Sequence, residues 1–233
     1  MRIRALAALV ALALCLPAGA TPVIRGSGVS GSAPTYAADA TAGSQTSIDV
    51  VVPSGSENDL LLVFVGQKSD GGGTTPTSDG AFTDISSDPG ASLEPSFLAT
   101  RLTYSSSEPS TYAFTVGDSA IAISARITGQ SVASPINGTP AYNEGNGTTL
   151  TCPSITTTVG NTLVLYVGVS RFSAFATSPS SATLQEEQLY PPADVVVAVA
   201  AKTQASAGAT GTDTYTTSST RRWICYTIAI APA

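Results

Sequence analysis

The hydrophobic and polar positions of this chain repeat one β-rich pattern twice. A polar stretch with an asparagine leads into a continuous apolar run that ends in Val-Gly, first within residues 54–66 and again within residues 158–168. A short β-branched stretch precedes each run, and a loop rich in serine, threonine and proline follows it. Apolar runs without alternation indicate strands that are buried on both faces. We therefore expect two copies of a half-sandwich, related by an approximate two-fold axis.

Shorter segments between and after the two runs also have the character of strands. Ile121, Ile123 and Ile127 share one parity, which gives a single apolar face. Turns rich in glycine, proline and serine separate such segments, and no stretch keeps a helical period. The pattern predicts an all-β fold, an antiparallel, jelly-roll-like β-sandwich of about ten strands with an internal pseudo-repeat.

The chain divides into three parts. Residues 1–20 have a basic start, a short apolar run and the ending Pro-Ala-Gly-Ala, so they predict a signal peptide that is removed before Thr21. That run is too short to span a bilayer, and no later segment is long and apolar enough, so no membrane insertion is expected after cleavage. Residues 21–45 are rich in glycine, serine and alanine, with a possible edge strand at 23–25. Residues 46–233 form the predicted sandwich domain, with half-repeats at 46–128 and 151–231.

Composition excludes some partners. Cleavage would remove Arg2 and Arg4 from the ten basic residues and none of the sixteen acidic ones. A net-negative chain with scattered basic residues is a poor match for nucleic acid or an anionic membrane surface. Only 11% of the residues are charged, and serine and threonine make up about a quarter of the chain. Together with the predicted signal peptide, this composition leads us to expect a secreted or cell-surface protein, with a virion as the alternative location.

Two cysteines remain after the predicted cleavage. Cys152 and Cys225 are an even pair in a chain expected to be exported, so they are candidates for a disulfide. The alternative is two separate buried thiols.

A series of short motifs in this order resembles a broad family of all-β, jelly-roll-like domains of unknown function. In the first half these are Val52-Pro53-Ser54-Gly55, Asn58-Asp59, Pro76, Gly80-Ala-Phe-Thr83, Arg101, Glu108-Pro109 and Tyr112-Ala-Phe-Thr115. In the second half Pro153-Ser-Ile-Thr-Thr157 and Asn161-Thr-Leu-Val164 also fit. Such domains occur in secreted bacterial proteins and in phage structural or tail-fibre proteins. The resemblance implies a jelly-roll-like sandwich without catalytic residues.

Catalytic chemistry has few candidates in this sequence. There is no histidine, which excludes Ser-His-Asp and Cys-His catalysis and the zinc sites that use imidazole. A glycoside hydrolase needs only two carboxylates about 5–9 Å apart across a cleft. The available glutamates are Glu94, Glu108, Glu144, Glu186 and Glu187. All lie in expected loops, where ordinary solvated surface carboxylates are the simpler explanation.

Two loops carry the candidate binding residues. Asp70, Asp79, Asp84 and Asp88 cluster after the first apolar run and are a weak calcium site, since Ca²⁺ prefers oxygen ligands from acid-rich loops. The corresponding loop of the second copy, residues 171–192, carries aromatic residues instead, namely Phe172, Phe175 and Tyr190. Because divergence between equivalent loops marks where function has replaced symmetry, the acidic loop is the first expected contact surface and the aromatic loop the second.

Trp223 completes the set of candidates. It lies beside the pair Arg221-Arg222, so it is either a stacking platform for a glycan or an ordinary core residue. We expect a non-enzymatic extracellular binding or structural module without a resident cofactor, whose partner is a glycan or a protein of a cell surface or virion. The alternatives are a virion or tail-fibre structural protein and a carboxylate-dependent glycoside hydrolase.

Overall fold

A computed structural model describes residues 23–24, 36–38, 46–68, 75–88, 95–171, 174–190 and 195–233. This part of the chain forms antiparallel strands and no helix, so the predicted all-β sandwich is confirmed. The predicted signal peptide and most of residues 21–45 lie outside the described residues. Within the described part of the chain, no helix has the length and apolar character to cross a membrane.

Sixteen strands are present in the described chain, where about ten are expected. The first half comprises β1 (Val23–Ile24), β2 (Tyr36–Ala38), β3 (Ser47–Val51), β4 (Leu60–Gln67), β5 (Thr83–Asp88), β6 (Ser96–Thr103), β7 (Thr111–Thr115) and β8 (Ala120–Thr128). The second half comprises β9 (Ala141–Cys152), β10 (Thr156–Thr157), β11 (Thr162–Arg171), β12 (Phe175–Thr177), β13 (Thr183–Tyr190), β14 (Val195–Gln204), β15 (Gly208–Ala209) and β16 (Asp213–Ile230).

The two halves build their main sheets with the same strand order. The first inner sheet runs β8-β4-β6-β5, and the second runs β16-β11-β14-β13. Each has a register shift on its last strand, between Asp84 and Ser86 in β5 and between Leu184 and Glu186 in β13. The outer edge of β8 pairs with β1 and β2, while β16 pairs with β9 and β12. Equal order and equally placed bulges are what an internal repeat predicts.

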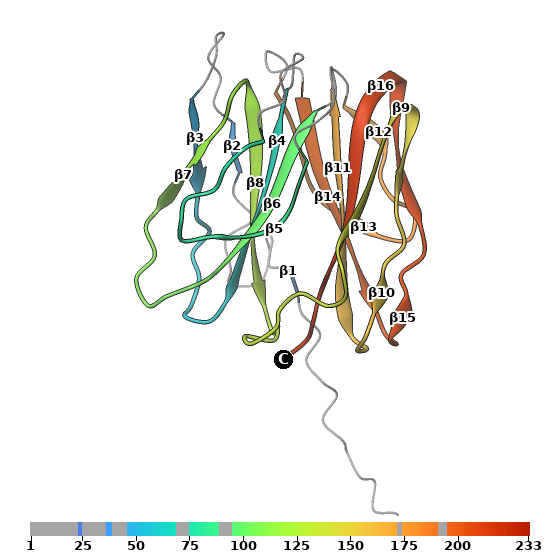
Figure 1. Ribbon diagram of the computed structural model, residues 1–233. Coiled ribbons are helices and arrows are strands. Elements are labelled where there is room, and N and C mark those ends of the chain that lie inside the picture. Colours follow the sequence, from blue (N-terminus) through green and yellow to red (C-terminus); the bar gives the residue numbers. More distant parts are fainter. Residues whose placement is uncertain are drawn as a thin grey trace, which may run out of the picture.

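The sheets stack in four layers (Figure 1). The two inner sheets face one another across a central core that includes Leu62, Phe64, Leu165 and Val167. The pair β3–β7 covers the other face of the first inner sheet through a second core. On the far side, β10–β15 and parts of β9 and β16 cover the second inner sheet through a third core. Each half therefore contributes one inner sheet to the central sandwich and adds an outer layer with a core of its own.

Burial on both faces explains the two apolar runs. Every residue of β4 and β11 is buried, because each strand has an inner sheet neighbour on both sides and a core on both faces. Alternation is lost when both faces are apolar. By contrast, β3 alternates between exposed and buried residues, since it lies in an outer layer.

The structure corrects the register between the two copies. Asn58 and Asn161 both take the left-handed backbone conformation, with φ of 70° and 53°, just before Leu60 and Leu163 enter the central core. Alignment on the two Val-Gly endings is therefore wrong by one residue. Gly66 faces the opposite inner sheet, whereas Gly168 faces Tyr215 and Phe175 in the third core. A one-residue slip in a strand exchanges its two faces, which is why the endings are not equivalent.

Strands β9 and β16 fold back together as one ribbon. Asn143 donates a side-chain hydrogen bond to the carbonyl of Thr151 (3.0 Å), so the two ends of β9 lie side by side. The register of β16 shifts between Thr216 and Arg221, where it arches over at one end of the molecule (Figure 1). Cys152 and Cys225 form a disulfide between the two limbs of this ribbon, with a Cα–Cα distance of 4.8 Å. The predicted pairing of these cysteines is thus present.

Gly66 should be intolerant of any side chain. A Cβ at this position would lie 2.5 Å from Val197 Cγ2 and 2.9 Å from Val169 Cγ1, and both valines are buried and stiff at χ1. We expect Gly66→Ala to lower the free energy of unfolding by about 1–3 kcal/mol, measured by urea denaturation. Gly80→Ala is the matched control, because a Cβ there meets no atom within 4 Å, and it should stay within about 0.5 kcal/mol of wild type. Equal effects of the two changes would contradict the close approach of the inner sheets.

Removal of the disulfide should be costly. The bridge joins residues 73 positions apart, and closure of such a loop contributes about 4 kcal/mol by chain entropy. We expect Cys152→Ala/Cys225→Ala to lose stability of that order in chemical denaturation. Both cysteines are fully buried, so a reductant should release thiols from wild type only when the protein unfolds. Two titratable thiols in native protein purified without reductant would contradict the bridge.

Candidate functional site

Among the described residues, the acidic side chains of the first loop make separate local hydrogen bonds and do not form one cluster. Asp79 accepts a hydrogen bond from the amide of Ala81 (3.0 Å) and so closes its own turn, and Asp84 accepts one from the hydroxyl of Ser78 (3.0 Å). Asp84 and Asp88 stand opposite Thr100 and Phe97 on β6, about 10 Å apart along that strand. Asp70 lies outside the described residues.

Within the described ranges, no group of three or more acidic, cysteine or histidine side chains is placed to hold a metal ion. Because Asp70 lies outside the described residues, the calcium expectation for Asp70, Asp79, Asp84 and Asp88 stays a prediction.

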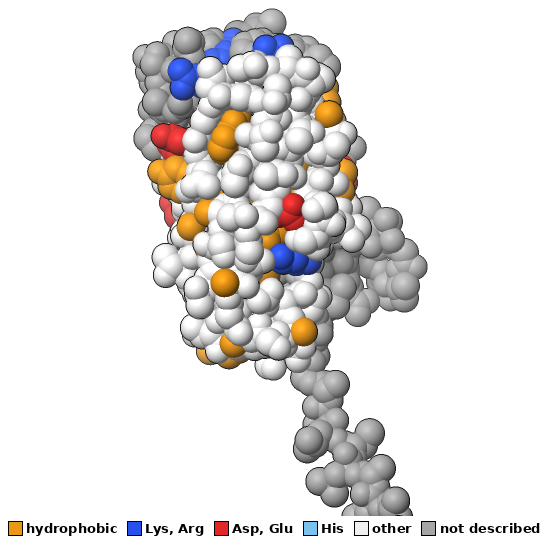
Figure 2. Space-filling model, turned by 90° about the vertical axis from the view of Figure 1, so that its right-hand side faces the viewer, with side chains coloured by type: hydrophobic (Ala, Val, Ile, Leu, Met, Phe, Trp, Pro, Cys, Tyr) orange, Lys and Arg blue, Asp and Glu red, His pale blue; other side chains and the backbone are white. Residues whose placement is uncertain are grey.

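The two described aromatic candidates, Trp223 and Phe175, belong to the third core. Trp223 is 8% exposed, its ring contacts Gly145, and it packs in the same cluster as Tyr215. Phe175 packs against the ring of Tyr215 with a centroid distance of 4.7 Å. Phe172 and the side chain of Tyr190 are outside the described part of the chain. Figure 2 views the outer side of the second half and shows scattered hydrophobic side chains rather than an aromatic platform. Trp223 is accordingly a core residue and offers no open ring face.

A different site appears where the two halves depart from their common pattern. In the second half the outer ladder continues beyond Ile155 through the pairs Thr156–Ala209 and Thr157–Gly208, which are β10 and β15. In the first half the outer ladder of β3 and β7 reaches Val51–Thr111, and the amide of Val52 still donates to the carbonyl of Ser110 (2.9 Å). Beyond this point the first-half chains separate and enclose a pocket.

Two prolines explain why the ladder ends. Continued in the register of β3 and β7, the next pairs would be Pro53 with Pro109 and Ser54 with Glu108. Proline has no amide hydrogen, so neither residue of the first pair can donate to the other. The residue of the second half that corresponds to Glu108 is Gly208, which has a φ of 143° that side chains rarely adopt. Of the four residues that would continue the ladder, Pro53, Pro109 and Glu108 therefore oppose its extension.

The pocket lies between the loop 52–55 and the loop 104–110 and has a volume of about 320 Å³. That size is near the lower end of the roughly 300–1,000 Å³ of small-molecule pockets. Its lining combines polar and apolar side chains, and the residues are Val52, Pro53, Ser54, Gly55, Tyr104, Ser105, Ser106, Glu108, Pro109 and Ser110.

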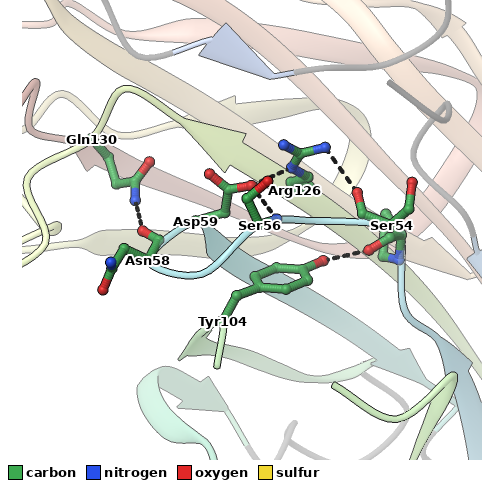
Figure 3. A network of polar contacts seen from close by, with 8 residues as sticks. Ser54, Ser56, Asn58, Asp59, Tyr104, Arg126 and Gln130 are labelled. Atoms are coloured by element: carbon green, nitrogen blue, oxygen red, sulfur yellow. Dashed lines mark hydrogen bonds and ion pairs between the residues drawn. The ribbon is translucent and has the colours of Figure 1, made fainter. Parts of the chain in front are cut away.

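A hydrogen-bond network holds the loop 52–59 in place. Figure 3 shows Tyr104, Arg126 and Gln130 directed toward this loop. Tyr104 donates its hydroxyl to the carbonyl of Pro53 (2.7 Å), and burial raises the pKa of its phenol. Arg126 forms an ion pair with Asp59 (2.6 Å) and also donates to the carbonyl of Ser54 (2.9 Å). These contacts hold one wall of the pocket rigid.

The same network also anchors the turn of this wall (Figure 3). Asp59 accepts the amide of Ser56 (2.8 Å), and the side chain of Gln130 donates to the carbonyl of Asn58 (2.7 Å). A Cβ on Gly55 would collide with the ring of Tyr104, so glycine is required where the loop crosses that ring. The wall is therefore built by local sequence and by residues that come from distant strands.

Glu108 supplies the charge of the pocket. Its Oε1 accepts the amide of Ser105 (2.5 Å), and its Oε2 accepts the hydroxyl of Tyr112. Burial opposes ionisation, but these hydrogen bonds outweigh it and lower the pKa of Glu108. Burial, the hydrogen bond to Glu108 and the charges of Glu108 and Asp79 raise the pKa of Tyr112. The carboxylate is thus ionised and held in one orientation at neutral pH.

Sequence reasoning noted these pocket residues without identifying a site. Val52-Pro53-Ser54-Gly55 and Glu108-Pro109 entered as motifs of the resemblance, and Glu108 also as one of five candidate carboxylates. The useful signal was the contrast between Pro53 and Pro109 in one copy and Thr156 and Ala209 in the other. That contrast required the strand register, which the Val-Gly alignment placed one residue off.

Comparison of the chain with protein-family models, with curated proteins and with solved structures found no match. The family resemblance of the motifs therefore stays a prediction. Function has to be argued from the geometry of the site.

The pH dependence of stability should report the state of Glu108. Because the pKa of Glu108 is lowered by folding, its contribution is present above the ordinary glutamate pKa of about 4.3 and is lost as the pH falls through the lower folded-state value. Glu108→Gln removes one of two acceptor oxygens, so it should be less stable than wild type at pH 7, with the difference shrinking below pH 4. The exposed Glu57→Gln is the control and should show no such difference. A gap between wild type and Glu108→Gln that persists at low pH would contradict this assignment.

Proposed function

We propose that this chain is a non-enzymatic extracellular binding or structural module, whose contact site is the pocket between the loops 52–55 and 104–110. The observation that carries the proposal is the departure from internal symmetry. The second half closes its outer ladder with β10 and β15, whereas the first half replaces the same pairs by two prolines and a rigid pocket. A fold that needed only stability would gain from the closed ladder in both halves.

Export is supported by the sequence and by the disulfide. The first twenty residues have the features of a signal peptide, and the one bridge in the described chain is fully buried. A genuine signal peptide favours a bacterial cell surface or secretion. The alternative within the class of non-enzymatic binding or structural modules is a structural protein of a virion or tail fibre.

The arrangement of carboxylates argues against the glycoside hydrolase alternative. Glu108 has a lowered pKa, which is the reverse of what a general acid needs. Burial raises the pKa of Glu186 and of Glu187, but these neighbours lie opposite Val199 and Ala198 on one strand and so point to opposite faces. Glu144 stands on β9 opposite Ile224, and Glu94 lies outside the described residues.

The proposal predicts binding without turnover. Purified disulfide-bonded protein should release no reducing sugar from a panel of polysaccharides above a heat-treated blank. A rate that exceeds the blank and is abolished by Glu186→Gln or Glu187→Gln would overturn the non-enzymatic assignment.

A glycan array with and without calcium tests which loop makes the contact. If the pocket is the contact site, binding should be independent of calcium and should be unchanged in the variant Asp70/Asp79/Asp84→Ala. Loss of binding in this variant or on calcium removal would move the contact site to the acidic loop.

A further inference from the structure

The polar groups of the pocket are suited to one class of ligand. The Glu108 carboxylate lines the pocket and accepts hydrogen bonds from the Ser105 amide, the Ser105 side chain and the Tyr112 hydroxyl, which leaves about one of its four acceptor positions for a ligand. The hydroxyls of Ser106 and Ser110 line the same space and make no hydrogen bond to any described residue. Together they present acceptors and hydroxyl groups to a ligand that carries several hydroxyl groups of its own.

The apolar part of the lining complements these groups. The exposed ring of Pro109 and the half-buried side chain of Val52 form hydrocarbon surface beside the hydroxyls, while Pro53 is buried behind them. A pyranose ring has faces of C–H groups and a rim of hydroxyl groups, so it can contact both kinds of surface at once. A pocket of about 320 Å³ is of the size that accepts such a small unit.

Charge narrows the class further. Glu108 is ionised, while the one cation beside the network, Arg126, is already engaged by Asp59 and by the carbonyl of Ser54. Among the described residues, no cationic side chain lines the pocket. A ligand with a carboxylate, sulfate or phosphate would therefore meet an uncompensated negative charge.

We infer that the pocket between the loops 52–55 and 104–110 binds a saccharide unit without an acidic group, with Glu108 accepting a hydrogen bond from a ligand hydroxyl group and Val52 and Pro109 contacting the carbon face of the ring. This inference rests on the proposed binding function and adds to it a site and a ligand class. The hydrogen bonds from Ser105 and Tyr112 that hold the Glu108 carboxylate prepare it for this contact, because its orientation is already set before the ligand arrives.

Three variants separate the site from the rest of the protein. Glu108→Gln keeps the shape of the side chain and removes its charge. Pro53→Thr/Glu108→Gly/Pro109→Ala introduces the residues that close the ladder in the second half, so it should fill the pocket while remaining folded. Glu57→Gln is the matched control. It changes an exposed glutamate of the loop 52–59 whose side chain does not line the pocket.

The experiment is a glycan array of neutral, amino and acidic oligosaccharides, followed by calorimetric titration of the strongest neutral oligosaccharide. We expect wild type and Glu57→Gln to bind this probe within twofold of one another, Glu108→Gln to bind at least tenfold more weakly, and the triple variant not to bind. Thermal unfolding checks that each variant is folded. Should the triple variant lose its fold, the Glu108→Gln and Glu57→Gln pair still decides the outcome.

Several results would overturn the inference. A preference for acidic oligosaccharides would reject the ligand class, and undiminished binding by Glu108→Gln or by a folded triple variant would reject the site. Both of these would leave the proposed binding function standing. Absence of glycan binding by wild type would reject the saccharide ligand, while the reducing-sugar assay tests the non-enzymatic assignment independently.

Discussion

The rest of the structure depends on the contact between the two inner sheets. Each inner sheet is covered on both faces, so β4 and β11 lie in the middle of the molecule with every residue buried. The sheets approach so closely at Gly66 that a Cβ would meet Val197 and Val169. Burial of this apolar surface is the main favourable contribution to folding, and it places the outer layers and their loops on a rigid support.

The outer layers are where the two halves differ. The second half folds the ribbon of β9 and β16 back on itself, ties it with the disulfide, and closes its end with β10 and β15. The first half ends its outer ladder at Val52 and Ser110. Because the inner sheets already provide stability, the first half tolerates an open end, and its loops can carry a binding site.

Pocket and scaffold are linked through residues that are far apart in the sequence. Tyr104 and Arg126 come from the ends of the inner-sheet strands β6 and β8, and both hold the loop that forms one wall of the pocket. The geometry of that wall therefore depends on the inner sheet rather than on the loop alone. Such support is what a pre-organised binding site requires.

The sequence by itself determined the fold class, the repeat and the cysteine pair, because apolar runs, turn residues and an even number of cysteines are local or countable signals. The sequence did not determine the register between the two copies. Aligning the copies on their asparagines or on their Val-Gly endings gives registers that differ by one residue, and only the face to which each side chain points distinguishes them. Tertiary structure also decided that Trp223 is a core residue and that Asp84 and Asp88 stand apart on β5. The open end of the first-half ladder belongs to the tertiary structure too: continued in the register of β3 and β7, the next pair would be Pro53 and Pro109, and neither can donate a hydrogen bond.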